Sequence, residues 1–507
     1  MPEGRRHPAP RRQRFVGPPL LRALPGSRLR LLPVIGILLM AIGCGGGTDG
    51  SAADRPNVLL ITVDTLRPDH LGCYGYDRPT SPNIDRLARR GILFRNAITA
   101  AGRTVQSFPS ILTGVYPQVH GLRYEGQSHE VLEGRMTLTR VLRDNGYDSF
   151  AVTQGLNVGL HRDFDIYDPD IYLDPSGKRV SVPTRSDHEA TLKAVHWLRG
   201  RGDRRAPFFL WLRYNAPHWP YEAPPPYTEM FDPDGAGLPH TFNQEAGPGV
   251  ERGDLIFGRT RLPDREVAHA VAHYDGEVAC ADHAIGELLQ ALEERGELAR
   301  TLVVLTADHG ESLGEHDYFF EHGAFLYEAT VRVPLIITPP AAALMRQGVV
   351  VETQARTIDI APTVLDAVRL EIPDGFQGVS LLPRARGMPD QPELLAYCES
   401  GRNFYRENPR QFVPGVAGKW RMIRSDDYKL IMIPRDPDPI WELYDLRADP
   451  GETTNLIADR PAVFARLKET LLAILAADPG REDRSEPPLP DGLGDQLRSL
   501  GYVGGGS

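Results

Sequence analysis

The sequence contains few cysteines and very few lysines for its length. Four cysteines among 507 residues are too few for a disulfide scaffold of this size. Residues 1–43 hold eight arginines and one acid, which leaves 49 basic and 66 acidic residues, a net charge of −17, in the rest of the chain. So acidic a body disfavours nucleic acid as a partner. After residue 43 no apolar run is long enough to span a bilayer, so a multi-span membrane protein is excluded.

The N-terminus has the pattern of an export signal. Residues 5–30 are basic, and an apolar run follows over residues 31–43. Because the run ends in Ala41-Ile42-Gly43-Cys44, it resembles a bacterial lipoprotein cleavage site, which predicts a lipid on Cys44 and membrane association through that lipid. A plain secretory signal and a short membrane anchor are the alternatives. We expect residues 1–43 to be the signal, residues 44–56 a flexible tether, and the chain to lie in the bacterial cell envelope, in the periplasm or on the outer surface.

The body of the chain alternates between strand and helix patterns. Continuous apolar runs rich in β-branched residues predict buried strands. Patterns of helical period between these runs predict helices. The strands are expected at residues 57–63, 149–153, 208–212 and 301–305, and the helices at residues 81–90 and 266–295. This alternation predicts an α/β fold with a mostly parallel sheet and helices on both faces.

Three of the predicted strands deliver polar side chains to one sheet edge. Asp64 follows the first strand, Asp308-His309 follows the strand at 301–305, and His218 lies shortly after the strand at 208–212. Ligands of such sheets bind at the carboxyl ends of the strands. Each residue alone is more often a turn former or a surface residue. Together they indicate a site for one divalent metal ion.

Longer motifs now resemble a family. Residues 57–64, 110–117, 304–311 and 443–456 are similar in order and content to motifs of the sulfatases, in the alkaline phosphatase superfamily, and the resemblance covers about residues 57–471. It implies an ester hydrolase of sulfate or phosphate esters. The implied fold is a large, mostly parallel central sheet covered by helices on both faces, followed by a smaller C-terminal α+β domain with an antiparallel sheet.

The resemblance also divides the chain. The sulfatase-like catalytic domain is expected at residues 57–387 and the smaller C-terminal domain at residues 388–475. Residues 476–507 are charged and rich in proline, and they are expected to form a linker and tail.

The nucleophile differs from the family pattern. Sulfatases carry Cys-x-Pro-x-Arg, or a serine version, whose first residue is oxidised to formylglycine, and no cysteine here begins such a motif. Ungapped alignment on residues 112–114 places Thr104 at the nucleophile, Phe108 at the arginine and Ser107 at the family serine. A second register begins at Ser107 and requires a deletion. Phosphodiesterases and phosphoethanolamine transferases of the superfamily use a metal-bound threonine, so Thr104 is the predicted nucleophile. It is expected just before a helix that runs through residues 107–112, and no formylglycine is expected.

The metal ligands differ as well. Asp64 is followed by threonine where sulfatases have a second aspartate, and Asp308 is followed by His309 where they have asparagine. Replacing a carboxylate or amide by an imidazole favours manganese or zinc over calcium, which remains possible. The resemblance therefore implies a metal set of Asp64, Asp308, His309 and the Thr104 hydroxyl.

Histidines replace the family's lysines in the predicted substrate site. None of the lysines lies in a matched active-site motif; the five are Lys178, Lys193, Lys419, Lys429 and Lys468. His322 stands at the position of a family lysine, and His218 matches a family His-x-Pro. With Ser107, both are predicted to bind the non-bridging oxygens of the ester, and one of them to protonate the leaving group. A purely structural role for each histidine is the alternative, and Glu311 and His316 are left open as nearby residues.

Three functions follow from these motifs. The leading hypothesis is hydrolysis of an anionic small-molecule, glycan or lipid-headgroup ester through a covalent threonyl ester. A sulfated threonine lacks the second hydroxyl with which hydrated formylglycine expels sulfate, so phosphoryl chemistry is favoured. A phosphoethanolamine-type transferase is the first alternative, because residues 308–315 resemble the transferase motif. A catalytically degenerate glycan-binding protein is the alternative of another class.

Overall fold

The computed structural model describes residues 55–123, 134–154, 156, 158–169, 187–235, 261–343, 346–401, 418–435 and 437–478. All of them belong to one compact unit that begins at Gly50. Cys44, the predicted signal and nearly all of the predicted tail lie outside the described residues. Within the described ranges, no helix is long and apolar enough to cross a membrane.

In the described residues, the central sheet has nine strands in the order β10-β2-β9-β6-β1-β5-β3-β4, with β11 paired to β2. Strand β9 runs antiparallel to β2 and β6, and the other ladders are parallel. The strands are β1 (Asn57–Val63), β2 (Ile92–Ile98), β3 (Asp148–Val152), β4 (Ile166–Asp168), β5 (Phe208–Tyr214), β6 (Thr301–Thr306), β9 (Arg332–Thr338), β10 (Val349–Val351) and β11 (Ala355–Arg356). This sheet confirms the predicted α/β class.

The centre of the sheet is buried on both faces. Every residue of β1, β5 and β6 is buried, which explains why their sequences are continuous apolar runs rather than alternating ones. In register, Leu59 of β1 lies between Leu210 of β5 and Val303 of β6. The four strands predicted from the sequence are therefore β1, β3, β5 and β6.

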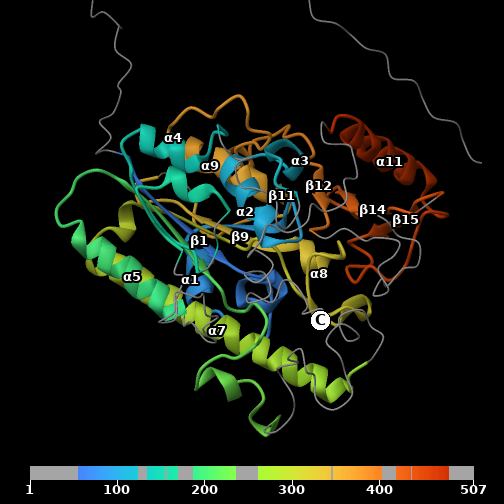
Figure 1. Ribbon diagram of the computed structural model, residues 1–507, viewed down its shortest axis with the longest axis horizontal. Helices are drawn as coiled ribbons and strands as arrows, with labels where there is room; N and C mark the ends of the chain where they lie inside the picture. The colour runs from blue at the N-terminus through green and yellow to red at the C-terminus, as the bar shows by residue number, and fades with distance from the viewer. Residues whose placement is uncertain are drawn as a thin grey trace, which may run out of the picture. The chain divides into compact units, whose positions relative to one another are not determined.

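Helices cover the sheet on both sides (Figure 1). One layer holds α1 (Pro82–Arg90), α5 (Asp187–Gly200) and α7 (Asp264–Glu294), and the other holds α2 (Thr104–Thr113), α4 (Leu138–Asp144) and α9 (Ile360–Ala367). Short helices complete the fold at α3 (Pro117–His120), α8 (Glu328–Val331) and α10 (Leu382–Ala385). The helices predicted at residues 81–90 and 266–295 are α1 and α7.

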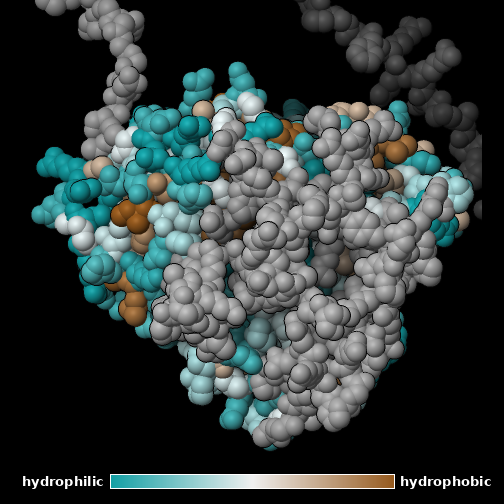
Figure 2. All heavy atoms as spheres, in the orientation of Figure 1, coloured by the Kyte–Doolittle hydropathy of each residue, from teal (hydrophilic) through white to brown (hydrophobic). Residues whose placement is uncertain are grey.

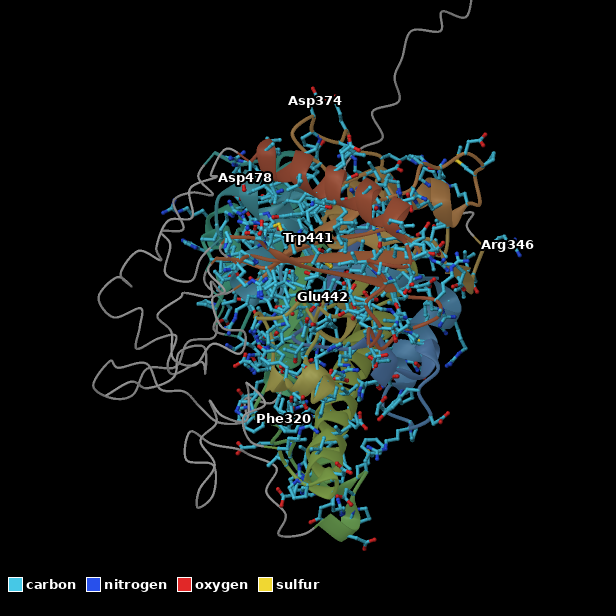
Figure 3. All side chains as sticks on the ribbon, turned by 90° about the vertical axis from the view of Figure 1, so that its right-hand side faces the viewer. Phe320, Arg346, Asp374, Trp441, Glu442 and Asp478 are labelled. Atoms are coloured by element: carbon cyan, nitrogen blue, oxygen red, sulfur yellow. The ribbon has the colours of Figure 1, made fainter. Side chains whose placement is uncertain are left out.

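A second, antiparallel sheet follows in the C-terminal part of the chain. Its order is β12-β13-β14-β15, and α11 (Pro461–Ala476) packs on it through the buried Leu467 and Leu471. The strands are β12 (Ala396–Glu399), β13 (Arg421–Arg424), β14 (Tyr428–Ile433) and β15 (Ile440–Asp445). Figure 3 shows Trp441 and Glu442 of β15 on this sheet. The smaller α+β portion is confirmed, while a boundary at residue 387 stays a prediction.

Contacts between the two sheets are made beside the start of α2. Ala101 forms a parallel bridge with Glu399 of β12. Arg123 donates to both carboxylate oxygens of Glu399, at 2.9 and 2.6 Å, and to Asp478 at 2.8 Å. The loop that leads into α2 is thus held by the C-terminal sheet.

Figure 2 shows mainly hydrophilic residues on the described part of the surface in this view.

Candidate active site

Two neighbouring parallel strands bring three metal-binding side chains together. Asp64 directly follows β1, and Asp308 and His309 lie just beyond β6. One ligand atom from each of the three residues lies within 4.8 Å of the others, and all three side chains are fully buried. The rule that ligands bind at the carboxyl ends of strands in such sheets therefore placed these residues correctly.

The arrangement of these atoms suits a cation. The Nδ1–H of His309 donates to the Gly310 carbonyl at 3.0 Å, which turns Nε2 towards Asp308 Oδ2 at 3.3 Å and Asp64 Oδ1 at 3.8 Å. Neither of these carboxylate oxygens has a hydrogen-bond partner among the described residues. Lone pairs from one nitrogen and two oxygens thus face one centre. Atoms bound to one ion at about 2.0–2.2 Å lie roughly 3–4 Å apart, so the residues fit a divalent metal.

Thr104 is the first residue of α2 and reaches the same centre. Its Oγ1 lies 3.1 Å from Nε2 of His309, and the residue is 1% exposed. The preceding Arg103 has extended backbone dihedral angles and accepts the first helical hydrogen bonds, from Gln106 and Ser107. The N–H groups of the first turn of α2 therefore belong to the same corner of the site as the threonine hydroxyl. The predicted helix is confirmed, but Thr104 is its first residue rather than the residue before it.

Ser107 has its hydroxyl turned to the backbone. It donates to the Asp308 carbonyl at 2.7 Å and contacts Oγ1 of Thr99 at 3.0 Å. These contacts join α2 to the loop that carries the metal ligands. Substrate binding by Ser107 stays a prediction.

Charges in the cluster are unequal. Burial alone would raise the pKa of Asp64, but the Arg213 guanidinium, which is bound to Oδ2, acts together with His218, His309 and a hydrogen bond to Asp308, and their combined effect lowers the pKa of Asp64. Burial and the charge of Asp64 raise the pKa of Asp308. Burial lowers the pKa of His309 to about 4. At neutral pH His309 is therefore a neutral imidazole, the form that binds metals.

The two other predicted histidines lie against this cluster. The rings of His309 and His322 are stacked with centroids 4.2 Å apart, and His218 lies 5.2 Å from His322. Nδ1 of His322 donates to Glu311 at 3.1 Å, and Nδ1 of His218 donates to the Trp219 carbonyl at 2.6 Å. In the neutral form of both histidines the proton is therefore on Nδ1, and Nε2 carries a lone pair. Burial lowers the pKa of His218.

Glu311 and His316, whose roles the sequence left open, lie in different places relative to the cluster. Glu311 is fully buried and orients His322. His316 lies outside the cluster, because its ring stacks on Tyr327 with centroids 3.5 Å apart.

Sequence reasoning missed three charged residues at the site. Arg213 comes from β5 and also donates to the carbonyls of Thr153 and Gln154, at 3.2 and 3.0 Å. Arg103 lies 3.5 Å from Glu321. A charged residue in an otherwise apolar, fully buried strand was a signal for Arg213. The positions of Arg103 and Glu321 offered no such signal.

Comparison with known proteins gives the family. Residues 56–370 match the sulfatase family, and residues 314–477 match the C-terminal domain of N-sulphoglucosamine sulphohydrolase. The chain belongs to the sulfatase family. As a sulfatase-family ester hydrolase, the enzyme acts on sulfate or phosphate esters, and its family typically binds a divalent metal. The site residues above provide a possible place for that metal.

Relatives of the enzyme cover most of its length. An N-acetylglucosamine-6-O-sulfatase from Bacteroides thetaiotaomicron is 27% identical over 497 residues, covering 83% of this chain and 86% of the relative. The multifunctional alkaline phosphatase superfamily protein PehA from Trinickia caryophylli is 29% identical over 495 residues, with 82% and 93% covered.

Solved structures share the fold. One, in complex with its substrate D-glucosamine-2-N,6-O-disulfate, has a TM-score of 0.68 at 24% identity and covers 85% of this chain and 100% of its own. The phosphonate monoester hydrolase of Agrobacterium radiobacter has a TM-score of 0.64 at 24% identity, with 83% and 96% covered.

Proposed function

We propose that the enzyme hydrolyses an anionic ester through Thr104 as a covalent nucleophile, and that phosphate esters are its better substrates. The observation that carries this proposal is the position of the Thr104 hydroxyl, 3.1 Å from His309 Nε2 and at the start of α2. A hydroxyl needs activation to act as a nucleophile. The buried cluster of Asp64, Asp308 and His309 is suited to supply it.

The metal site in this proposal consists of Asp64, Asp308, His309 and the Thr104 hydroxyl. A bound divalent ion would lower the pKa of that hydroxyl and offset negative charge on the ester. Two carboxylates and one imidazole favour manganese or zinc, with calcium possible.

The proposed reaction has two steps. In the first, Thr104 Oγ forms a bond to phosphorus and its proton passes to Nε2 of His218 or His322; the bond to the leaving oxygen breaks, and that oxygen takes the proton from the same Nε2. In the second, water attacks phosphorus, the Thr104–phosphorus bond breaks, a proton from the water returns to Thr104 Oγ, and phosphate leaves. In this proposal the backbone N–H groups of Thr104 and Val105 donate to the non-bridging oxygens, because those of Gln106 and Ser107 already donate to the Arg103 carbonyl. A sulfate ester would form the same intermediate but leave it without an internal route to breakdown.

The substrate class in this proposal is an anionic sugar or lipid-headgroup ester. Support comes from relatives named for sulfated sugars, among them the N-acetylglucosamine-6-O-sulfatase. The phosphonate monoester hydrolase shares only the fold at its level of identity. We further propose that the chain is exported to the bacterial envelope and lipid-anchored at Cys44. Replacing Cys44 with serine should release it from the membrane fraction.

Two variants test the nucleophile. Thr104→Ala should abolish turnover, and Thr104→Ser, which keeps a hydroxyl, should retain part of it. Both are assayed with phosphate monoesters, phosphodiesters, phosphonates and aryl sulfates in the presence of manganese, zinc or calcium. Turnover by Thr104→Ala at the wild-type rate would refute the assignment. Transfer of a headgroup from a lipid donor to an acceptor, without release to water, would favour the transferase.

A further inference from the structure

A buried arginine lies next to the proposed nucleophile. Arg103 precedes Thr104 in the chain and is 1% exposed. Burying a guanidinium costs free energy unless charged or polar partners stabilise it. A buried positive charge beside the proposed nucleophile is a candidate for binding the anionic ester.

Glycines from two parts of the fold make room for this side chain. A Cβ atom added at Gly323 would overlap Nε and Cγ of Arg103, and one added at Gly401 would overlap its Cβ and Cγ. Gly323 follows His322, and Gly401 follows β12 of the C-terminal sheet. Both loops therefore approach so closely that no larger residue fits, and they hold the stem of Arg103 in one path.

The guanidinium of Arg103 lies beside the histidines that are proposed to bind the substrate. Nη2 of Arg103 lies 3.5 Å from Oε1 of Glu321. The same oxygen accepts a hydrogen bond from the backbone N–H of His322 at 3.1 Å and lies 3.9 Å from its Nδ1. The ring of His322 stacks on His309, whose Nε2 contacts Thr104. The guanidinium is thus on the His322 side of the nucleophile.

The second buried arginine of the site has a different use. Arg213 is bound directly to Asp64 and to two backbone carbonyls, so its charge serves a metal ligand. Arg103 instead pairs with Glu321, at 3.5 Å, beside the histidines proposed to bind the ester. A guanidinium fork has the geometry to bind the non-bridging oxygens of such an ester.

We propose that Arg103 is a catalytic residue that binds non-bridging oxygens of the ester and of the threonyl ester. Glu321 keeps the guanidinium in place between turnovers. This inference rests on the proposed function of Thr104 and adds to the site a guanidinium, which stays positively charged at any working pH. It also assigns a role to Gly323 and Gly401, which hold that charge in position.

Binding of inorganic phosphate and sulfate tests the proposal without turnover. In the metal-loaded enzyme, calorimetry should show that Arg103→Gln weakens phosphate binding on the order of 10- to 100-fold, the range for hydrogen bonds to charged groups. Arg103→Lys, which keeps the charge and most of the stem but lacks the fork, should lose on the order of 10-fold in phosphate affinity and in kcat/KM.

Rescue separates binding from a structural role. In Arg103→Ala, millimolar guanidinium chloride should restore part of the phosphate affinity, whereas sodium chloride at the same concentration should not. Phosphate affinity of Arg103→Gln or Arg103→Lys within about two-fold of wild type overturns the proposal. If Arg103→Gln unfolds at a lower temperature than wild type, the phosphate affinity of Arg103→Lys decides whether the proposal holds. Normal turnover by Thr104→Ala, together with weak phosphate binding by the Arg103 variants, would refute the nucleophile and leave this inference standing.

Discussion

Replacing Arg213 with glutamine removes the counter-charge of a buried carboxylate. Arg213 is 3% exposed and Asp64 is fully buried, and the guanidinium contacts Oδ2 of Asp64 directly. The same group satisfies the carbonyls of Thr153 and Gln154. Glutamine is shorter and neutral, so the variant leaves a buried carboxylate without its partner.

The expected cost is large in the metal-free protein. Breaking a buried ion pair by removing one partner costs about 3–5 kcal/mol, and each buried acceptor left without a donor adds about 1 kcal/mol or more. A divalent ion bound by Asp64 supplies a second counter-charge, so metal should recover a substantial part of the loss. The free-energy difference between Arg213→Gln and wild type should therefore be smaller with metal than without it.

Urea unfolding of both proteins, with manganese and after chelation, measures this difference. Arg143→Gln is the matched control, because Arg143 pairs with Asp165 at 2.9 Å with side chains 36% and 44% exposed. Its loss should cost no more than about 1 kcal/mol, independent of metal. A loss of less than 1 kcal/mol for Arg213→Gln after chelation, or the same loss with and without metal, would refute the reasoning.

Two other predictions concern stability. Burial raises the pKa of Asp187 to about 7, so the folded state binds more protons than the unfolded state between about pH 4 and 7, and this group's contribution falls as pH rises through that window. As pH rises from about 4 to 7, the free energy of unfolding of Asp187→Asn should increase relative to that of wild type, by at most about 1.4 kcal/mol per pH unit. The same difference between the two proteins in urea unfolding at pH 5 and at pH 7 would contradict this. Lys429→Met should cost about 3–5 kcal/mol in the same assay, because the fully buried amino group lies 3.0 Å from Glu328 and 2.6 Å from Glu452. Lys468→Met, which removes only a surface contact with aromatic rings, should cost about 1 kcal/mol or less, and equal losses for the two lysines would argue against the burial argument.

Much of the fold could be predicted because its signals are local. The runs at β1, β5 and β6 are apolar on both faces and read directly as buried strands. The position of Asp64 beside Asp308 followed from strand ends in a parallel sheet. The antiparallel direction of β9 and the pairing of β2 carried no sign in the local pattern.

The charged partners at the site could not be predicted in the same way. Arg213 meets Asp64 across 149 residues of sequence, and Arg103 meets Glu321 across 218. Such pairings depend on the packing of the complete fold, because a charge is tolerated in the interior only where distant residues satisfy it. Motif spacing within one segment does not report them. The hydroxyl of Ser107 shows the same limit, since its bond to the Asp308 carbonyl joins residues 201 positions apart in the sequence.

The bridge between Ala101 and Glu399 has a consequence for how the enzyme is made. Synthesis proceeds from the N-terminus, so Thr104 exists long before the strand that holds its loop. The anchor at Arg123 is complete only when Glu399 and Asp478 have both emerged. A nascent or truncated chain therefore contains the proposed nucleophile without the contacts that hold its loop. We expect ester hydrolysis to begin only when β12 and the residues after α11 are in place, so that activity would report complete folding.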